Sequence, residues 1–202
     1  MSPGASPAQA SPRASHHRER ILDAISALVA EQGYHDTAVD DVVARARCSK
    51  TAFYASFAGK EHAFAALLER EGERLLEAVV DAVSAETDPR RRVAAGVGTF
   101  VRGCVRDVAT ARILLIESVG VSTTIEECRR RLHARFAAMI LAQARVARAS
   151  TDPARTGIDL ETLAYAVVGA VNEAVVHLLE SGGDVDGAVR TVEHLVAGAL
   201  LS

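Results

Sequence analysis

The chain has 202 residues, of which 49% are hydrophobic and 24% charged, and its formal net charge is −3. This is the balance of a globular protein with a core, and it does not favour a basic protein that coats nucleic acid. The three cysteines are odd in number and form no CxxC pair, which argues against a disulfide framework or a zinc site and indicates a reducing compartment.

The first residues, 1–15, are rich in Ser, Pro and Ala, and this composition predicts a disordered tail. The tail has no apolar core, so we do not expect it to be a secretory signal. No apolar run is expected to reach the length of a membrane span. The chain is therefore predicted to be cytoplasmic, with no membrane partner.

Apolar residues at helical spacing, separated by capping residues and by Gly or Pro, predict about nine helices and no strand. The predicted fold class is all-α. In chain order the predicted helices are 16–32, 38–46, 49–56, 60–85, 89–106, 109–118, 125–149, 158–180 and 185–200. Gly33 is expected to end the first of them. Thr37 is expected to cap the second with Asp40 answering it, and Ser49 to cap the third.

The segment 46–64 contains the only lysines of the chain, Lys50 and Lys60, and three of its phenylalanines. Between Asp41 and Glu61 there are four basic residues and no acidic one, a local positive charge that attracts phosphate. A longer helix followed by two short helices with a gap of about three residues is typical of a helix-turn-helix. The third helix would then enter the major groove of DNA.

The stretch TAVDDVVARARCSKTAFYASFAGKEHAF, residues 37–64, resembles the DNA-binding signature of the TetR family of bacterial transcriptional regulators. The resemblance covers roughly residues 18–64. The positions that carry it are Thr37, Ser49, Phe53, Tyr54, Phe57, Lys60 and Glu61. Arg47 departs from the pattern, because the turn position that it occupies is usually Gly, and a positive φ there would be costly for Arg.

The resemblance implies a helix-turn-helix domain over residues 16–60, followed by a larger helical domain, 61–202, that binds a ligand and dimerises. The first turn of the third helix can reach base edges, and neighbouring hydroxyl and amino groups suit phosphate oxygens. The residues predicted to contact DNA are Thr37, Arg47, Ser49, Lys50, Thr51, Ala52, Tyr54, Ser56 and Lys60.

The helix 158–180 is apolar around most of its circumference, so it must be covered on more than one side. A second copy of the chain is one cover, through an antiparallel pair formed with the helix 185–200; burial of both helices within one subunit is the alternative. The residues predicted at a homodimer interface are Val167, Val171, Val175, Leu178, Val192, Leu195 and Val196.

Polar residues on one side of the helix 158–180 either line a ligand cavity or form hydrogen bonds across the dimer. The residues predicted to bind a small, mostly hydrophobic effector are Phe100, Phe136, Tyr165, Asn172, Glu173 and His177. No cofactor is expected. Glu173 and His177 lie one helical turn apart, but two ligands do not make a metal site, and no metal is predicted.

Three functions remain open at this point. The first is a ligand-responsive transcriptional regulator, a repressor that binds an inverted-repeat operator as a homodimer. The second is a helical interaction module or small-molecule-binding protein without sequence-specific DNA binding. The third is an enzyme, which is not expected, because the chain has no Gly-rich phosphate loop and no GxSxG or HExxH motif.

Overall fold

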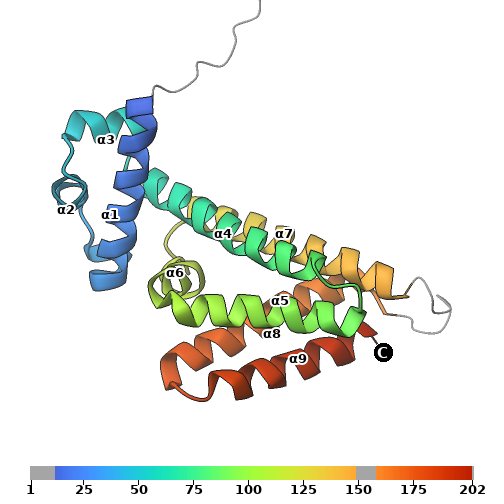
Figure 1. Cartoon of the computed structure of the whole chain (residues 1–202). Helices are drawn as coiled ribbons and strands as arrows, with labels where there is room; N and C mark the ends of the chain where they lie inside the picture. The colour runs from blue at the N-terminus through green and yellow to red at the C-terminus, as the bar shows by residue number, and fades with distance from the viewer. Residues whose placement is uncertain (1–11, 149–157, 202) are drawn as a thin grey trace, which may run out of the picture. The chain divides into compact units, whose positions relative to one another are not determined.

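The computed structural model describes residues 12–148 and 158–201. These residues form the helices α1 to α9 and one π-helical turn, and no strand occurs among them (Figure 1). The all-α fold class is therefore confirmed. Residues 1–11 of the predicted disordered tail lie outside the described residues, but residues 12–15 are helical, so the tail as predicted was too long.

The chain forms two compact units, residues 1–67 and 68–202. The division falls between Leu67 and Leu68, inside α4 (Lys60–Ser84), rather than after residue 60 as expected. The first turns of α4 belong to the first unit because Phe64 is fully buried there, with its ring centroid 4.6 Å from that of Tyr34.

The first unit contains α1 (Pro12–Asp36), α2 (Val39–Arg45), α3 (Lys50–Ser56) and the start of α4. The backbone leaves the helical conformation at Gly33, where φ is 83°, so α1 breaks at the predicted residue. Phe53 and Phe57 of α3 are 0% and 1% exposed, and α3 packs against α1 and α2. These two rings hold α3 in place.

A side chain of α1 forms hydrogen bonds with the turn between α2 and α3. The guanidinium of Arg20 donates hydrogen bonds to the carbonyls of Ala46 and Arg47, the second at 2.9 Å. Arg47 takes φ 48° and is the one residue other than Gly with positive φ in the described chain. The turn thus keeps the left-handed geometry that usually calls for Gly, at a cost in backbone strain.

The second unit begins with the remainder of α4. The further elements are α5 (Pro89–Arg106), α6 (Val108–Arg112), the π-helical turn (Ile113–Glu117), α7 (Thr123–Arg148), α8 (Leu160–Ser181) and α9 (Val185–Leu201). Here α5 packs against α8 and α9, and α7 packs against α8 (Figure 1). As predicted, α5 begins at Asp88-Pro89: the Asp88 carboxylate accepts a hydrogen bond from the backbone N–H of Arg91 at 2.9 Å.

The helices α4 and α7 approach closely in the second unit because Gly72 has no side chain. A Cβ at this position would lie 2.6 Å from the methyl groups of Leu132. Ion pairs between Arg131 and Glu69, at 2.9 Å, and between Arg135 and Glu73 lie along the same contact. A glycine therefore sets the separation of the two helices that form one side of this unit.

By length and composition alone, α8 is the one helix among the described residues that passes as a membrane span. This corrects the expectation that no apolar run would be long enough. A core helix can pass the same test, and α8 packs against α5, α7 and α9 in the second unit. The apolar composition of α8 is therefore explained by its packing against these three helices.

The strain at Arg47 can be tested with two substitutions. We expect Arg47→Gly to raise the free energy of unfolding by about 1 kcal/mol, because Gly adopts a positive φ without a Cβ clash. Arg47→Ala removes the same side chain but keeps the Cβ, so it should give no such gain. Urea unfolding followed by circular dichroism measures both, and equal effects would show that the backbone of Arg47 is not strained.

Candidate functional site

The exposed side of α3 is the candidate DNA-reading surface. The hydroxyl oxygen of Ser49 accepts a hydrogen bond from the N–H of Ala52 at 3.1 Å, so Ser49 caps α3 as predicted. Lys50, Thr51 and Tyr54 are exposed, with Tyr54 at 56%. Because Phe53 is buried on the other side, this short helix presents a lysine, a threonine and a tyrosine together.

The ammonium of Lys50 lies 2.6 Å from the carboxylate of Asp40 on α2. The hydrogen bond that the Lys50 ammonium donates to the Asp40 carboxylate raises the pKa of Lys50, so this side chain is charged at neutral pH. Both partners are exposed, and an exposed ion pair contributes little to stability. A phosphate or a base edge can therefore replace Asp40 at low cost.

Thr37 does not belong to this surface, which corrects its prediction as a DNA contact. It is 1% exposed, and its hydroxyl donates a hydrogen bond to the carbonyl of Gly33 at 2.8 Å. Thr37 therefore provides a hydrogen-bond donor for a carbonyl at the end of α1, and it does not cap α2. The predicted capping interaction of Asp40 is also wrong. The N–H of Ala38 donates a hydrogen bond to the carboxylate of Asp41 instead, at 3.0 Å.

Lys60 is also occupied within the first unit. Its ammonium donates to the carbonyls of Tyr34 and His35, at 2.9 and 3.3 Å, and lies 4.2 Å from the centre of the Tyr34 ring. Burial lowers the pKa of Lys60. The side chain thus stabilises the carbonyl end of α1, and its prediction as a phosphate contact is replaced by this structural role.

Two further residues predicted to contact DNA are less accessible than expected. Ala52 is half-buried, and the half-buried Ser56 donates its hydroxyl proton to the carbonyl of Ala52 at 3.2 Å. Arg47 and Ser49 are exposed beside the start of α3. The accessible set is therefore centred on the turn and the first half of α3.

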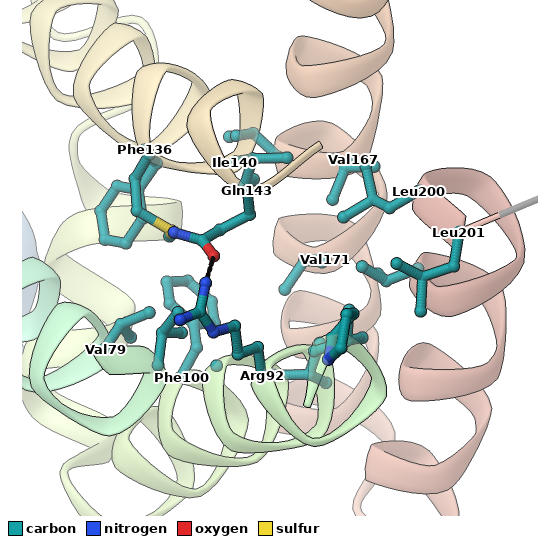
Figure 2. A pocket seen from close by; sticks show the side chains of 18 of the residues that line it. Val79, Arg92, Phe100, Phe136, Ile140, Gln143, Val167, Val171, Leu200 and Leu201 are labelled. Carbon is teal, nitrogen blue, oxygen red and sulfur yellow. Dashed lines mark hydrogen bonds between the residues drawn. The ribbon is translucent and has the colours of Figure 1, made fainter. Parts of the chain in front are cut away.

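A mainly apolar cavity of about 190 Å³ lies inside the second unit (Figure 2). Its wall comes from α4, α5, α7, α8 and α9, through side chains such as Val79, Phe100, Ile140, Val171 and Leu200. Such a wall, with few polar groups, is typical of a small-molecule site.

One end of the cavity is closed by aromatic rings. Phe100 of α5 and Phe136 of α7 meet edge to face, with ring centroids 5.6 Å apart and planes at 86°. Both side chains are 8% exposed. Toward the other end the lining includes the exposed residues Thr87, Pro89 and Val146, which marks this as the open end among the described residues.

The polar groups of the lining are few. At the open end the guanidinium of Arg92 donates to the side-chain oxygen of Gln143 at 3.1 Å and to the carbonyl of Glu86 at 2.8 Å. Figure 2 shows Arg92 and Gln143 reaching toward each other from α5 and α7. Asn172 of α8 also lines the cavity.

Asn172 is paired with a half-buried histidine on α7. Its side-chain amide nitrogen lies 3.3 Å from Nε2 of His133. Burial lowers the pKa of His133, and the nearby Arg129 lowers it further, while Glu126 opposes the shift. The lowered pKa favours the neutral imidazole, which lies beside an amide that lines the cavity.

The structure divides the predicted ligand residues into two groups. Phe100, Phe136 and Asn172 line the cavity, whereas Tyr165, Glu173 and His177 do not and are exposed. The three exposed residues lie at intervals of four or eight along α8 and so form one ridge on its outer side. Their assignment to a ligand pocket is therefore corrected.

Most of the predicted interface residues are core residues of the single chain. This corrects their assignment, because a side chain that is already buried has almost no surface left for a partner. The buried ones are Val167, Val175, Leu178, Val192 and Val196, all at most 9% exposed. Val171 lines the cavity, and Leu195 is 52% exposed. The alternative prediction, burial of both helices within one subunit, therefore explains why the inner faces of α8 and α9 are apolar.

The sequence analysis missed Arg92 and Gln143. A signal was present, since Arg92, Gly96 and Phe100 follow one another at intervals of four on α5. On α7, Phe136, Met139, Ile140 and Gln143 share one face at intervals of three and four. Starting from the two phenylalanines, these spacings lead to the polar pair at the open end.

A helix-turn-helix unit followed by a helical unit with an apolar cavity is the arrangement that the resemblance to bacterial regulators implies. Residues 21–67 match the sequence model of the bacterial regulatory proteins of the tetR family. The HTH-type transcriptional activator FasR of Mycolicibacterium smegmatis is 34% identical over 83 residues, which are 41% of this chain and 38% of that protein. The match thus spans about two fifths of the length of that relative.

Solved structures extend the likeness to nearly the whole chain. The fatty acid degradation regulator FadR of Bacillus halodurans has a TM-score of 0.81 and 17% identity over 96% of this chain and 98% of its own. FadR of Bacillus subtilis, solved in complex with stearoyl-CoA, has a TM-score of 0.81 and 16% identity over 90% of this chain and 98% of its own. At these identities the likeness shows the fold alone.

The resemblance to the TetR family that the motif in residues 37–64 predicted is confirmed by the match of residues 21–67 to the model of that family. The matched family model and the matched relative are both of regulators, which agrees with the expectation that the chain is not an enzyme. Glu173 and His177 are both exposed, and no group of three or more potential metal ligands occurs in the described part of the chain.

The lowered pKa of the half-buried His133 predicts a pH dependence of stability. The folded pKa of His133 lies below that of the unfolded chain, which is about 6.5. As the pH falls below that value, the unfolded chain binds a proton first, so the free energy of unfolding should decrease toward pH 5. We expect His133→Gln to make this decrease smaller.

The matched control is His194→Gln, which removes an exposed imidazole on α9 and leaves His133 in place. Urea unfolding of the three proteins at several pH values between 5 and 8 measures the slopes. An unchanged slope in His133→Gln would contradict the role of burial at this histidine.

Proposed function

We propose that this protein is a DNA-binding transcriptional regulator whose affinity for its operator changes when an apolar ligand fills the cavity of the second unit. The observation that carries the proposal is the combination of an exposed, basic α3 with an internal apolar cavity in one chain. The tetR family match over residues 21–67 supports the DNA-binding part. Such a regulator acts in the cytoplasm, where the chromosome lies.

We propose that Lys50 and Thr51 reach base edges, because they begin α3 and the start of a recognition helix meets the groove. The phenol of Tyr54 and the guanidinium of Arg47 suit phosphate oxygens and would position the helix. Ser49 and Ala52 lie beside them and would approach the backbone more closely. Lys60 and Thr37 would act indirectly, by holding α1 in place behind α3.

We propose that the effector is a fatty acyl compound. The FadR structure from Bacillus subtilis holds stearoyl-CoA, and the structure from Bacillus halodurans is of a fatty acid degradation regulator. The cavity supports this chemistry, since its lining is dominated by Val, Phe, Ile and Leu side chains. From Phe136 to Val146 the lining extends about 15 Å along α7, at 1.5 Å per residue. This length suits an extended alkyl chain better than a compact ring.

We also propose that the protein acts as a homodimer through the outer faces of α8 and α9. The exposed side of these helices carries small residues, and a Cβ added at Gly169 or Gly198 would meet nothing within 4 Å. The exposed Tyr165 and Leu195 flank them. Small residues let two helices approach closely, and large ones beside them supply apolar area. Of the interface residues first predicted, the proposed interface keeps Leu195, and it replaces the buried ones by the outer faces of α8 and α9.

A two-fold dimer would present two α3 helices, so the operator should be an inverted repeat. The direction of regulation does not follow from the fold, because FasR is an activator. A repressor role stays a prediction, and it is tested by whether the bound protein lowers or raises transcription from a promoter that carries the operator.

The DNA-binding part is tested with Lys50→Ala. If Lys50 meets a base edge, the variant should lose about 1–3 kcal/mol of specific binding, and its preference at one operator position should relax. The operator is first selected from random duplexes, and binding is then measured by fluorescence anisotropy at several salt concentrations.

The matched control is Arg190→Ala, which removes another exposed, ion-paired cation, 3.4 Å from Asp184 on the second unit. This variant should bind the selected duplex as the parent does. If Lys50→Ala binds selected and random duplexes equally well as the parent, α3 is not the reading helix.

The dimer is tested with Leu195→Glu. A carboxylate on the proposed apolar interface would be buried without a partner, so the dimer dissociation constant should rise about a hundredfold. Sedimentation velocity at micromolar concentration measures this. The control is Val119→Glu, at a residue 55% exposed outside α8 and α9, which should stay dimeric. A parent protein that sediments as a monomer would refute the dimer.

A further inference from the structure

The cavity carries its charge at one end only. Arg92 is the single charged residue among the described residues that line it, and no carboxylate is among them. Its guanidinium is half-buried at the open end, whereas the aromatic rings of Phe100 and Phe136 close the other end. The site is thus positive at its entrance and apolar beyond it.

The partners of Arg92 are neutral. The guanidinium donates to an amide oxygen of Gln143 and to the carbonyl of Glu86, and no ion pair to it is found in the described part of the chain. A guanidinium has five N–H donors and binds carboxylate or phosphate oxygens in pairs. An anionic oxygen in place of the Gln143 oxygen would make a hydrogen bond charged on both sides, which is the stronger kind.

We propose that Arg92 is the headgroup anchor that makes this cavity selective for anionic amphiphiles. The alkyl chain lies between α5, α7 and α8, and the anionic end, either a carboxylate or the phosphates of a thioester carrier, is held at the guanidinium. The inference rests on the proposed function and adds to it the residue that distinguishes a charged ligand from a neutral one of equal length.

The anchor also has a structural consequence. The Arg92–Gln143 hydrogen bond joins α5 to α7 across the open end of the cavity (Figure 2). An anionic headgroup that takes the place of the Gln143 oxygen removes this link, while a neutral ligand leaves it. Ligand charge therefore decides whether α5 and α7 stay tied at this end.

The experiment measures the binding of three probes to the full chain: dodecanoate, dodecanoyl-CoA and dodecanol. Isothermal titration is carried out below the micelle concentrations. The parent protein should bind at least one of the two anions about tenfold or more tightly than dodecanol. The comparison of the two anions shows whether a carboxylate or a thioester carrier supplies the charge.

Three variants separate charge from packing. Arg92→Gln should lose about tenfold or more in affinity for the preferred anion and keep dodecanol within about twofold. Gln143→Glu, which places a competing carboxylate beside Arg92, should lose the same preference with the guanidinium still present. Arg91→Gln, at an exposed arginine that does not line the cavity, should bind all probes as the parent does. A thermal melt of each variant confirms that it is folded.

The outcomes are distinct. Equal affinity of the parent for dodecanol and both anions, or an equal loss for all probes in Arg92→Gln, overturns the anchor and leaves an acyl site in place. No binding of any probe overturns the acyl ligand of the proposed function together with the anchor. The DNA-binding arm, measured separately with Lys50→Ala, is unaffected by either result.

Discussion

The requirement to cover α8 on all sides governs the second unit. This helix is apolar enough to pass as a membrane span, yet only 28% of its most apolar stretch is buried within the chain. Its inner face, with Val168 and Val175, packs into the core formed by α5, α7 and α9. The cavity is the part of that inner surface that neighbouring side chains leave unfilled. The outer face is what a second copy of the chain would cover.

Polar side chains in both units lie where a backbone carbonyl or another side chain provides a hydrogen-bond partner. In the first unit, Lys60 and Thr37 donate hydrogen bonds to carbonyls near the end of α1, the helix that packs against α3. In the second unit, Arg92 and Gln143 meet at one end of a mainly apolar cavity. A buried polar group without a hydrogen-bond partner is costly in free energy. Each of these side chains therefore lies where it can form a hydrogen bond with a neighbouring polar group.

The helix-turn-helix shows how a motif can be kept with one unfavourable residue. Arg47 adopts a positive φ, and the cost is offset by the hydrogen bonds that Arg20 donates to the carbonyls of Ala46 and Arg47. The buried rings of Phe53 and Phe57 fix α3 independently of the turn. The reading surface therefore does not depend on a glycine at position 47.

The sequence by itself determined the helices, their order and the helix-turn-helix. Apolar spacing, the caps at Ser49 and Asp88 and the break at Gly33 are local signals, since each acts within a few residues along the chain. The same local spacing placed Asn172 and Glu173 together, because it gives the relative positions of residues on a helix.

Which side of each helix faces inward depends on packing between distant segments and was not predictable from local patterns. Asn172 turned toward the cavity and Glu173 toward solvent because α5, α7 and α9 set the rotation of α8, which no local pattern contains. The role of Arg92 was not predicted for the same reason, because its partner Gln143 is 51 residues away in the chain. Packing likewise places the ammonium of Lys60 at the carbonyls of α1 rather than at a phosphate. Contacts between distant segments, which depend on packing, assigned these side chains their roles.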